Sequence, residues 1–134
     1  MAAVPHLTLE YTANLEEKAP DPGLLEKIHS LLASEAGIRI ENCKSRWREV
    51  ENWVVGQGEA DAAFVHLDLR FLEGRREETV EAVGRGALAI LEDHFFPAPG
   101  KLELQLTVEV AEIRRSAYFK APEGTLSPPP GKMA

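Results

Sequence analysis

The 134-residue chain lacks several features that would assign it to a particular class of protein. Its single cysteine, Cys43, has no partner for an internal disulfide, which is typical of a protein from a reducing cytoplasm. No apolar run approaches the roughly 18 residues of a membrane-spanning helix. The first residues form neither a basic leader nor a long apolar stretch, so we expect no secretion signal. These absences predict a cytoplasmic protein that does not enter a membrane.

Basic residues are also scarce, because 15 Lys and Arg stand against 22 Asp and Glu, for a net charge of −7. This balance argues against non-specific binding to nucleic acid, which requires a basic face. An anionic ligand would need a local group of basic side chains to offset the overall charge. Such a local site is feasible, since salt screens charges over about 8 Å at physiological ionic strength.

The hydrophobic residues that are present follow a strand–helix–strand pattern that occurs twice, with a repeat of roughly fifty residues. The predicted strands cover 5–11, 62–72 and 101–113, and the predicted helices cover about 22–36 and 76–95. Alternation is clearest over residues 101–113, where five apolar residues from Leu102 to Val110 occupy every second position, and residues Ala63 to Phe71 alternate in the same way. Residues 38–55 are less regular, and either two weak strands or one long bent strand fits them.

The helices carry local start and stop signals. Asp21 is placed to cap the first helix, Pro22 suits its first position, and Gly37 suits its end. In the second helix, the glycines of "GRG" at 84–86 lie inside the helical pattern, so they indicate close packing rather than a phosphate-binding loop.

Each strand–helix–strand unit is a crossover, so its two strands should be parallel. Two helices cover only one face of the resulting sheet, and the open face and exposed edges favour association with further copies. We therefore predict an α+β protomer of two layers within a homo-oligomer, with one domain over residues 1–120. Residues 121–134, rich in proline and glycine, are expected to be a disordered tail.

Several stretches between Pro5 and about Lys120 resemble one enzyme family. They are "PHLTLEY", "SRW", "DAAFVHLDL", "EGRR" and "RRSAYFK". They are similar to the 5-carboxymethyl-2-hydroxymuconate isomerases, a family of the tautomerase superfamily. The resemblance implies a four-stranded mixed sheet built from paired β-α-β units, a trimer, and sites near subunit boundaries. It also implies an isomerase that converts a carboxylated 2-hydroxydienoate into its conjugated 2-oxo isomer during breakdown of aromatic acids such as hydroxyphenylacetate. We expect neither a cofactor nor a metal.

The resemblance implies that Pro5 is the catalytic base. An α-amino group has a pKa near ~8, and burial or neighbouring cations would lower that pKa, leaving a neutral amine ready to accept a proton. This chemistry requires Pro5 to be the first residue, because an internal proline nitrogen is an amide without basicity. The alternative is that Pro5 only opens a strand, a position where proline is tolerated.

The resemblance implies catalytic roles for two further residues. Arg75, in "EGRR", matches the family arginine that holds a substrate carboxylate or polarises the carbonyl. Lys44 stands where the family has arginine; it keeps the charge but loses the planar fork of the guanidinium. Arg46 is a candidate to take over that contact. The competing interpretation of Arg75 is a solvated turn residue, with Arg76 beside it.

Further candidates for contact with a substrate are weaker. His6 adjoins the proposed base, and Phe64 and Trp53 would wall an apolar pocket around the diene, although core or interface packing explains both aromatics equally well. His66 and Asp68 share a strand face, but two ligands without a third are weak evidence for a metal. We interpret His66 as a hydrogen-bonded sheet residue.

Residues 1–4 separate Pro5 from the start of the sequence, so removal of the initiator methionine would expose Ala2. We favour the hypothesis that residues 1–4 are a non-native extension and that translation starts at the Val4 codon. Processing by a protease is the alternative. Two other functions remain open: a non-catalytic trimeric protein that binds small anions with Pro5 acylated, and a regulatory module that pairs with another chain.

Overall fold

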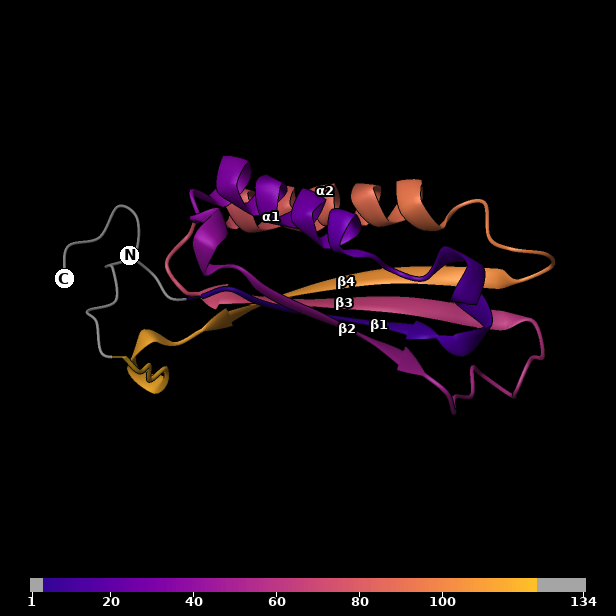
Figure 1. Ribbon diagram of the computed structural model, residues 1–134. Helices are drawn as coiled ribbons and strands as arrows, with labels where there is room; N and C mark the ends of the chain where they lie inside the picture. The colour runs from indigo at the N-terminus through magenta and orange to yellow at the C-terminus, as the bar shows by residue number, and fades with distance from the viewer. Residues whose placement is uncertain (1–3, 123–134) are drawn as a thin grey trace.

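The computed structural model of the chain describes residues 4–122, and it has a four-stranded sheet covered on one face by two helices (Figure 1). The strands are β1 (His6–Thr12), β2 (Lys44–Val50), β3 (Ala62–Leu72) and β4 (Glu103–Ile113), and the helices are α1 (Pro22–Ala36) and α2 (Glu77–Phe95). Short 3-10 helices are η1 (Ala13–Lys18), η2 (Ile40–Asn42) and η3 (Arg115–Ala117). The predicted two-layer α+β architecture is confirmed. The expected tail lies, from residue 123 onward, outside the described residues.

The sheet has the order β2-β1-β3-β4. β1 pairs in parallel with β2, β3 pairs in parallel with β4, and the central pair of β1 with β3 is antiparallel. The predicted parallel pairing within each unit is therefore confirmed. As a consequence, β1 and β2 begin at the same end of the sheet at which β3 and β4 finish.

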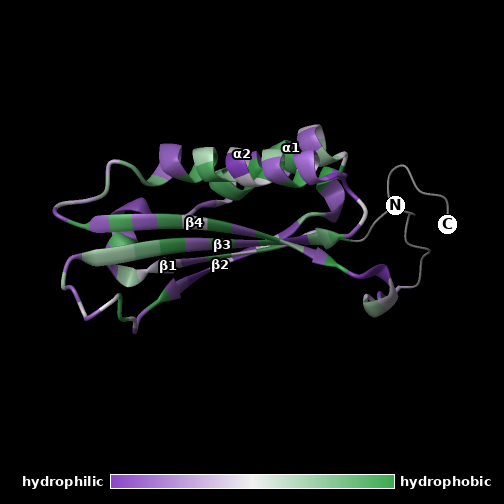
Figure 2. Cartoon of the chain, turned by 180° about the vertical axis from the view of Figure 1, so that it is seen from behind, coloured by the Kyte–Doolittle hydropathy of each residue, from purple (hydrophilic) through white to green (hydrophobic). Residues whose placement is uncertain are grey.

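The two faces of the sheet have different compositions because side chains alternate along each strand. Leu7, Leu9 and Leu67 are fully buried beneath the helices, whereas His6 and Thr8, which alternate with them, are only partly buried. Figure 2 shows the same alternation of hydrophobic and hydrophilic segments along β4. The core therefore fills the space between sheet and helices, and the opposite face, here called the open face, is polar.

Helix α1 begins and ends as its sequence signals predict, and α2 contains the two glycines that were expected to allow close packing. The carboxylate of Asp21 accepts a hydrogen bond from the Leu24 N–H at 2.9 Å, and Gly37 ends α1 in the left-handed conformation with φ of 65°. A Cβ atom at Gly86 would lie 2.7 Å from Leu31 Cδ1 of α1. The expectation that the "GRG" glycines allow close packing is confirmed at Gly86, where a Cβ atom would require the Leu31 side chain to shift.

Residues 38–55 form neither two strands nor one long strand. They contain the short helix η2 and then the single strand β2, which ends at Val50. Val50 pairs with Thr12, the last residue of β1, and the chain beyond Thr12 turns into η1. β2 is an edge strand, so it stops where its only neighbour stops. Within residues 4–122, no helix combines the length and apolar character needed to cross a membrane.

Candidate active site

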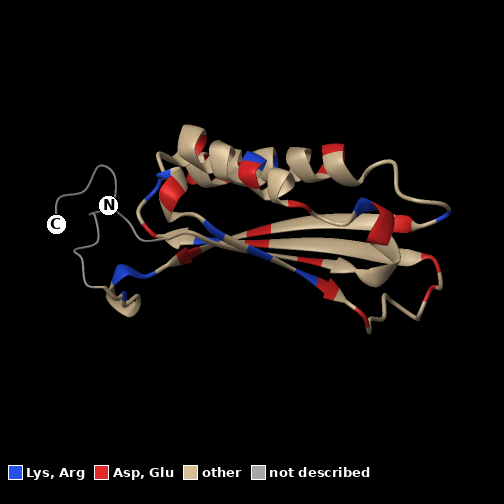
Figure 3. Cartoon of the chain, viewed as in Figure 1, with Lys and Arg blue, Asp and Glu red and all other residues tan. Residues whose placement is uncertain are grey.

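The directions of the strands gather basic residues at one end of an otherwise acidic protein. Pro5 precedes β1, Lys44 begins β2, Arg75 follows β3, and Arg115 follows β4. In Figure 3 the segment after β4 carries basic residues, whereas the loops at the opposite end carry mostly acidic ones. We call this region the basic end, and it comprises Pro5, His6, Lys44, Arg46, Arg75 and Arg115. Its charge meets the requirement for a local anion site in a chain with net charge −7.

Pro5 is buried, and its carbonyl accepts a hydrogen bond from the Lys44 N–H at 3.2 Å. That bond holds the start of β2 next to the proposed base. Val4, which acylates the Pro5 nitrogen in the 134-residue chain, is itself only 1% exposed. In this form of the chain the nitrogen is an amide, so the basicity of Pro5 depends on removal of Val4.

Arg75 is held in a fixed position on the helix side of the sheet. Its Nε donates to the Ala36 carbonyl at 3.0 Å and its Nη1 to the Leu72 carbonyl at 3.2 Å, while the guanidinium lies 5.1 Å from the centre of the Phe71 ring. Burial, and next the charge of Arg115, lower the pKa of Arg75. Nη2 has no hydrogen-bond partner among residues 4–122. Arg75 is thus anchored by one edge of its guanidinium rather than solvated in a turn.

Arg115 lies near Arg75 and was not among the residues selected from the sequence. Its Nε and Nη1 are buried and lack a hydrogen-bond partner within residues 4–122, and its backbone N–H donates to a Glu73 carboxylate oxygen at 3.0 Å. Burial lowers the pKa of Arg115. Buried guanidinium donors normally have acceptors, so this pair of arginines is suited to an anion.

On the open face, His6 connects residues of β2 to the segment that follows β4. Its Nδ1 lies 3.3 Å and 3.4 Å from the two Nη atoms of Arg46, and its Nε2 lies 3.0 Å from the Tyr118 hydroxyl. Burial lowers the pKa of His6, and the charges of Arg46 and Lys44 lower it further. Both the lowered pKa and the two Arg46 donors that face Nδ1 favour a neutral imidazole. Lys44 itself donates from Nζ to the Asn42 carbonyl at 3.1 Å.

Phe64 and Trp53 do not join this group within one chain. The Phe64 N–H donates to Thr12 Oγ1 at 3.2 Å, at the far end of β1, and Trp53 follows the end of β2. A strand of seven residues spans about 20 Å, so both aromatic residues lie at the opposite end of the sheet from Pro5. Their contact with a substrate stays a prediction, and it requires a neighbouring copy of the chain.

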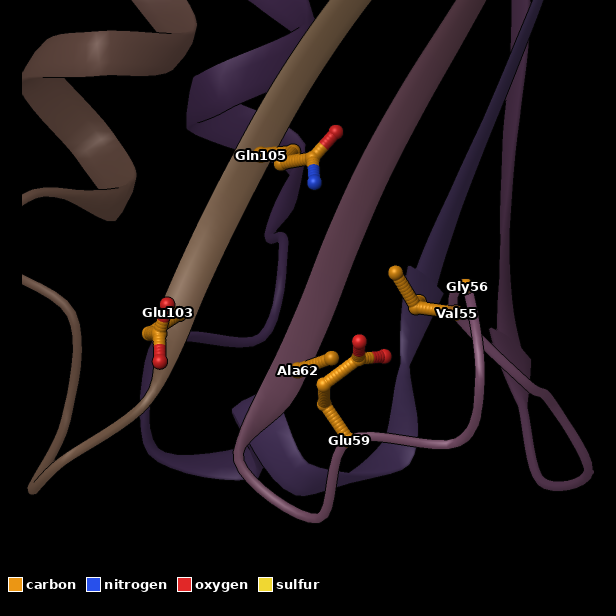
Figure 4. Close-up of a pocket in the computed structure, with 6 residues that line it drawn as sticks. All are labelled: Val55, Gly56, Glu59, Ala62, Glu103 and Gln105. Atoms are coloured by element: carbon orange, nitrogen blue, oxygen red, sulfur yellow. The ribbon is translucent and has the colours of Figure 1, made fainter.

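A hollow at that opposite end has the wrong charge for a carboxylated ligand. Its lining includes the carboxylates of Glu59 and Glu103 together with Gln105 (Figure 4). Val55, Gly56 and Ala62 complete the lining, which contains no basic side chain. We call this region the acidic end. It would repel an anion, whereas the basic end would attract one.

His66 is a hydrogen-bonded sheet residue, as predicted. Its Nδ1 lies 2.7 Å from Thr107 Oγ1, and its Nε2 lies 3.5 Å from a carboxylate oxygen of Glu109. Within residues 4–122 no group of three or more His, Cys, Asp and Glu side chains is arranged to hold a metal ion. The interactions of His66 are accounted for by its neighbours on β4.

Comparison with known proteins identifies the family of the chain. The family model described as 5-carboxymethyl-2-hydroxymuconate isomerase matches residues 5–123. The chain belongs to this family. The 5-carboxymethyl-2-hydroxymuconate Delta-isomerase of Escherichia coli is 29% identical over 117 residues, which cover 87% of this chain and 93% of that protein.

Solved structures agree with the family assignment. A 5-carboxymethyl-2-hydroxymuconate isomerase from Deinococcus radiodurans R1 is 33% identical, with a TM-score of 0.77 over 86% of this chain and 87% of that one. A symmetric trimer of fused 4-OT is 17% identical, with a TM-score of 0.69 over 88% of this chain and 93% of that one. The second likeness shows the fold alone.

Proposed function

We propose that this member of the 5-carboxymethyl-2-hydroxymuconate isomerase family isomerises a carboxylated 2-hydroxydienoate to its conjugated 2-oxo isomer, with Pro5 as the base. The observation that carries the proposal is the family match, which begins at Pro5, the residue around which the basic end is built. We further propose that the reaction belongs to cytoplasmic breakdown of aromatic acids such as hydroxyphenylacetate.

The proposed reaction moves one proton. The neutral Pro5 amine takes the proton of the 2-hydroxyl group, the electrons shift along the diene as the C=O bond forms, and the amine returns the proton to a distal carbon. Because the amine returns the proton that it takes and no electrons are gained or lost, this reaction requires no cofactor. Arg75 and Arg115 on one side, and Lys44 and Arg46 on the other, would bind carboxylates and keep the Pro5 amine neutral through their charges.

The burial of Val4 bears on how the base is generated. A chain that begins at Pro5 loses a side chain that is 1% exposed, and burial of a valine contributes about 1.5–3 kcal/mol. We therefore expect the shortened chain to be less stable than the 134-residue chain. Its site, however, gains both the amine and the volume that Val4 occupied.

The test compares two preparations, one beginning at Pro5 and one retaining residues 1–4, both verified by intact mass spectrometry. Conversion of 2-hydroxymuconate and its 5-carboxymethyl derivative is followed by ultraviolet absorbance. We expect turnover by the chain that begins at Pro5. The rate should be at least 100-fold lower when Pro5 is acylated, and Pro5→Ala should show a comparable loss, because a general base contributes about 10²–10⁴-fold to the rate. Equal activity of both preparations, or none in either, would contradict the proposal.

The alternative function is a non-catalytic protein that binds small anions with Pro5 acylated. The buried Val4 favours this candidate, because it makes the acylated form well packed. It predicts that protein from the native gene retains residues 1–4 and binds the dienoate saturably without converting it. Calorimetric titration of the same two preparations separates the two functions.

We also propose that the chain acts as a homotrimer whose sites lie at subunit boundaries. The fused 4-OT structure, described as a symmetric trimer, shares the fold, and β2 and β4 leave two open sheet edges on each chain. Phe64 and Trp53 of one chain lie far from Pro5 of the same chain. In an oligomer they would instead approach Pro5 of a neighbouring copy. Sedimentation equilibrium gives the mass, and a monomer would contradict this assembly.

A further inference from the structure

The segment after β4 places a tyrosine against the residue that follows Pro5. The Tyr118 hydroxyl lies 3.0 Å from His6 Nε2, and the two rings are tilted by 57° with centres 6.1 Å apart. Tyr118 follows η3, the same short helix that begins with Arg115. One segment therefore supplies both a second guanidinium and a phenol to the basic end.

The hydrogen bonds determine which atoms carry hydrogen. A guanidinium has donors and no acceptors, so Arg46 must donate to His6 Nδ1, at 3.3 Å and 3.4 Å. A neutral imidazole has one N–H, which is consequently on Nε2 and is donated to the Tyr118 oxygen. The Tyr118 O–H is left to donate elsewhere, and no acceptor for it is present among residues 4–122.

The surroundings of His6 maintain this arrangement. Lys44 and Arg46 face it from β2, and Arg70, which pairs with Asp68 at 3.1 Å, lies opposite His6 in the register with β3. Burial and the β2 charges lower the pKa of His6, in the direction that favours the neutral ring required by the Arg46 contact. Tyr118 thus receives one hydrogen bond and keeps its own donor free.

We propose that Tyr118 is a catalytic hydrogen-bond donor to the substrate oxygen that changes from hydroxyl to carbonyl, with His6 as its positioning residue. This inference rests on the proposed function. As Pro5 removes the hydroxyl proton, negative charge develops on that oxygen, and a prearranged donor stabilises it more than it stabilises the neutral hydroxyl. No bond of Tyr118 breaks, so the proton count of the reaction is unchanged.

The experiment removes this hydroxyl in the chain that begins at Pro5. We expect Tyr118→Phe to lower kcat about 100-fold, as for loss of one oxyanion donor, with KM changed less than about threefold. Tyr11→Phe is the matched control, because it deletes the same group from a tyrosine near the other end of β1, and it should leave kcat unchanged.

The role of His6 has its own pair of variants. His6→Gln keeps an N–H near the position of Nε2 and should retain most of the activity, whereas His6→Ala should approach the loss seen in Tyr118→Phe. Nitrogen-15 NMR of the full chain, without substrate, should show the Nε2–H tautomer of His6 at neutral pH, and Tyr118→Phe should shift its Nε2 resonance.

The outcomes are distinguishable. Normal turnover by Tyr118→Phe in an active wild-type background, or an Nδ1–H tautomer of His6, would overturn the role of Tyr118 and leave the proposed function standing. Equal losses in His6→Gln and His6→Ala would overturn the positioning role. Absence of turnover by the wild-type chain that begins at Pro5 would overturn the proposed function and the role of Tyr118 together.

Discussion

The two ends of the sheet differ in charge although they belong to the same strands. At the basic end, Arg75 and Arg115 lie close enough for the charge of one to lower the pKa of the other. At the acidic end, Glu59 and Glu103 line the same hollow. The comparison shows that net charge, −7 for this chain, says little about a site when strand directions sort the charges. The electric field of the two ends together would direct an anionic ligand to the basic end.

The ends also differ in how their charged side chains are held. Arg75 is anchored by two backbone carbonyls and the Phe71 ring, and Arg46 is bonded to His6. Further along the open face, the guanidinium of Arg48 forms an ion pair with the carboxylate of Glu10 at 3.0 Å, so its charge is already balanced within the chain. The guanidinium groups of Arg75 and Arg46 thus have neutral hydrogen-bond partners, which leaves them able to pair with a ligand. Glu73 and Glu112 act on the guanidinium groups of Arg115 and Arg75, respectively, only through their charge.

Among the arginines of the basic end, the largest effect is expected for Arg75→Ala. Loss of a charged hydrogen bond to the substrate, worth about 2–3 kcal/mol, should lower kcat/KM roughly 30- to 150-fold. The free energy of unfolding should fall by about 2 kcal/mol, because the Ala36 and Leu72 carbonyls lose their donor. The neighbouring, exposed Arg76→Ala is the control and should change unfolding by less than about 0.5 kcal/mol. Steady-state kinetics measure kcat/KM, and urea denaturation measures the free energy of unfolding. Equal effects of the two variants would contradict a role of Arg75 in the site.

A smaller effect is expected from a pair of arginines two positions apart on the same strand face. Arg46→Ala should raise KM about fivefold, as expected for loss of an exposed charge contact of about 1 kcal/mol. Arg48→Ala removes the same side chain from a pair with Glu10 and should leave KM within about twofold. Initial rates at low salt measure the difference. A larger effect of Arg48 would extend the basic end along β2.

The smallest effect comes from neutralising one glutamate at each end. Glu73→Gln removes a negative charge beside Arg115 and should lower KM about two- to threefold, within the range of exposed charge interactions. Glu103→Gln makes the same change at the acidic end, about 20 Å or more away and beyond the screening length, and should leave KM unchanged. Substrate titrations at physiological salt measure both. A clear response to Glu103→Gln would show that the acidic end of a neighbouring copy approaches the site.

Local sequence signals predicted most of the fold. The Asp21 cap and the left-handed Gly37 bound α1 as expected, and alternation placed β3 and β4 correctly. These features depend on a few neighbouring residues, so the sequence contains them directly. The end of β2 at Val50 was not predictable in this way, because it depends on where its partner β1 stops.

The candidate site was predictable only in part. Pro5, Arg75 and Lys44 were selected through resemblance to a family, and the structure brings them to one end of the sheet. Arg115 and Tyr118 were missed, because their positions follow from the pairing of Leu72 with Ile113, a register that no local pattern specifies. If the sequence had shown that β3 and β4 end side by side, Arg115 and Tyr118 would have been predicted to lie near Arg75.

By itself the sequence determined the helices, three of the four strands and the identities of the basic residues, since periodicity and capping act over a few positions. Only the tertiary structure decided which charged side chains lie close together. Antiparallel pairing of β1 with β3 brings the start of one strand pair to the finish of the other, and it carries Phe64 and Trp53 to the far end. Register across long loops depends on packing of the whole core, so the site is a property of the fold rather than of any segment.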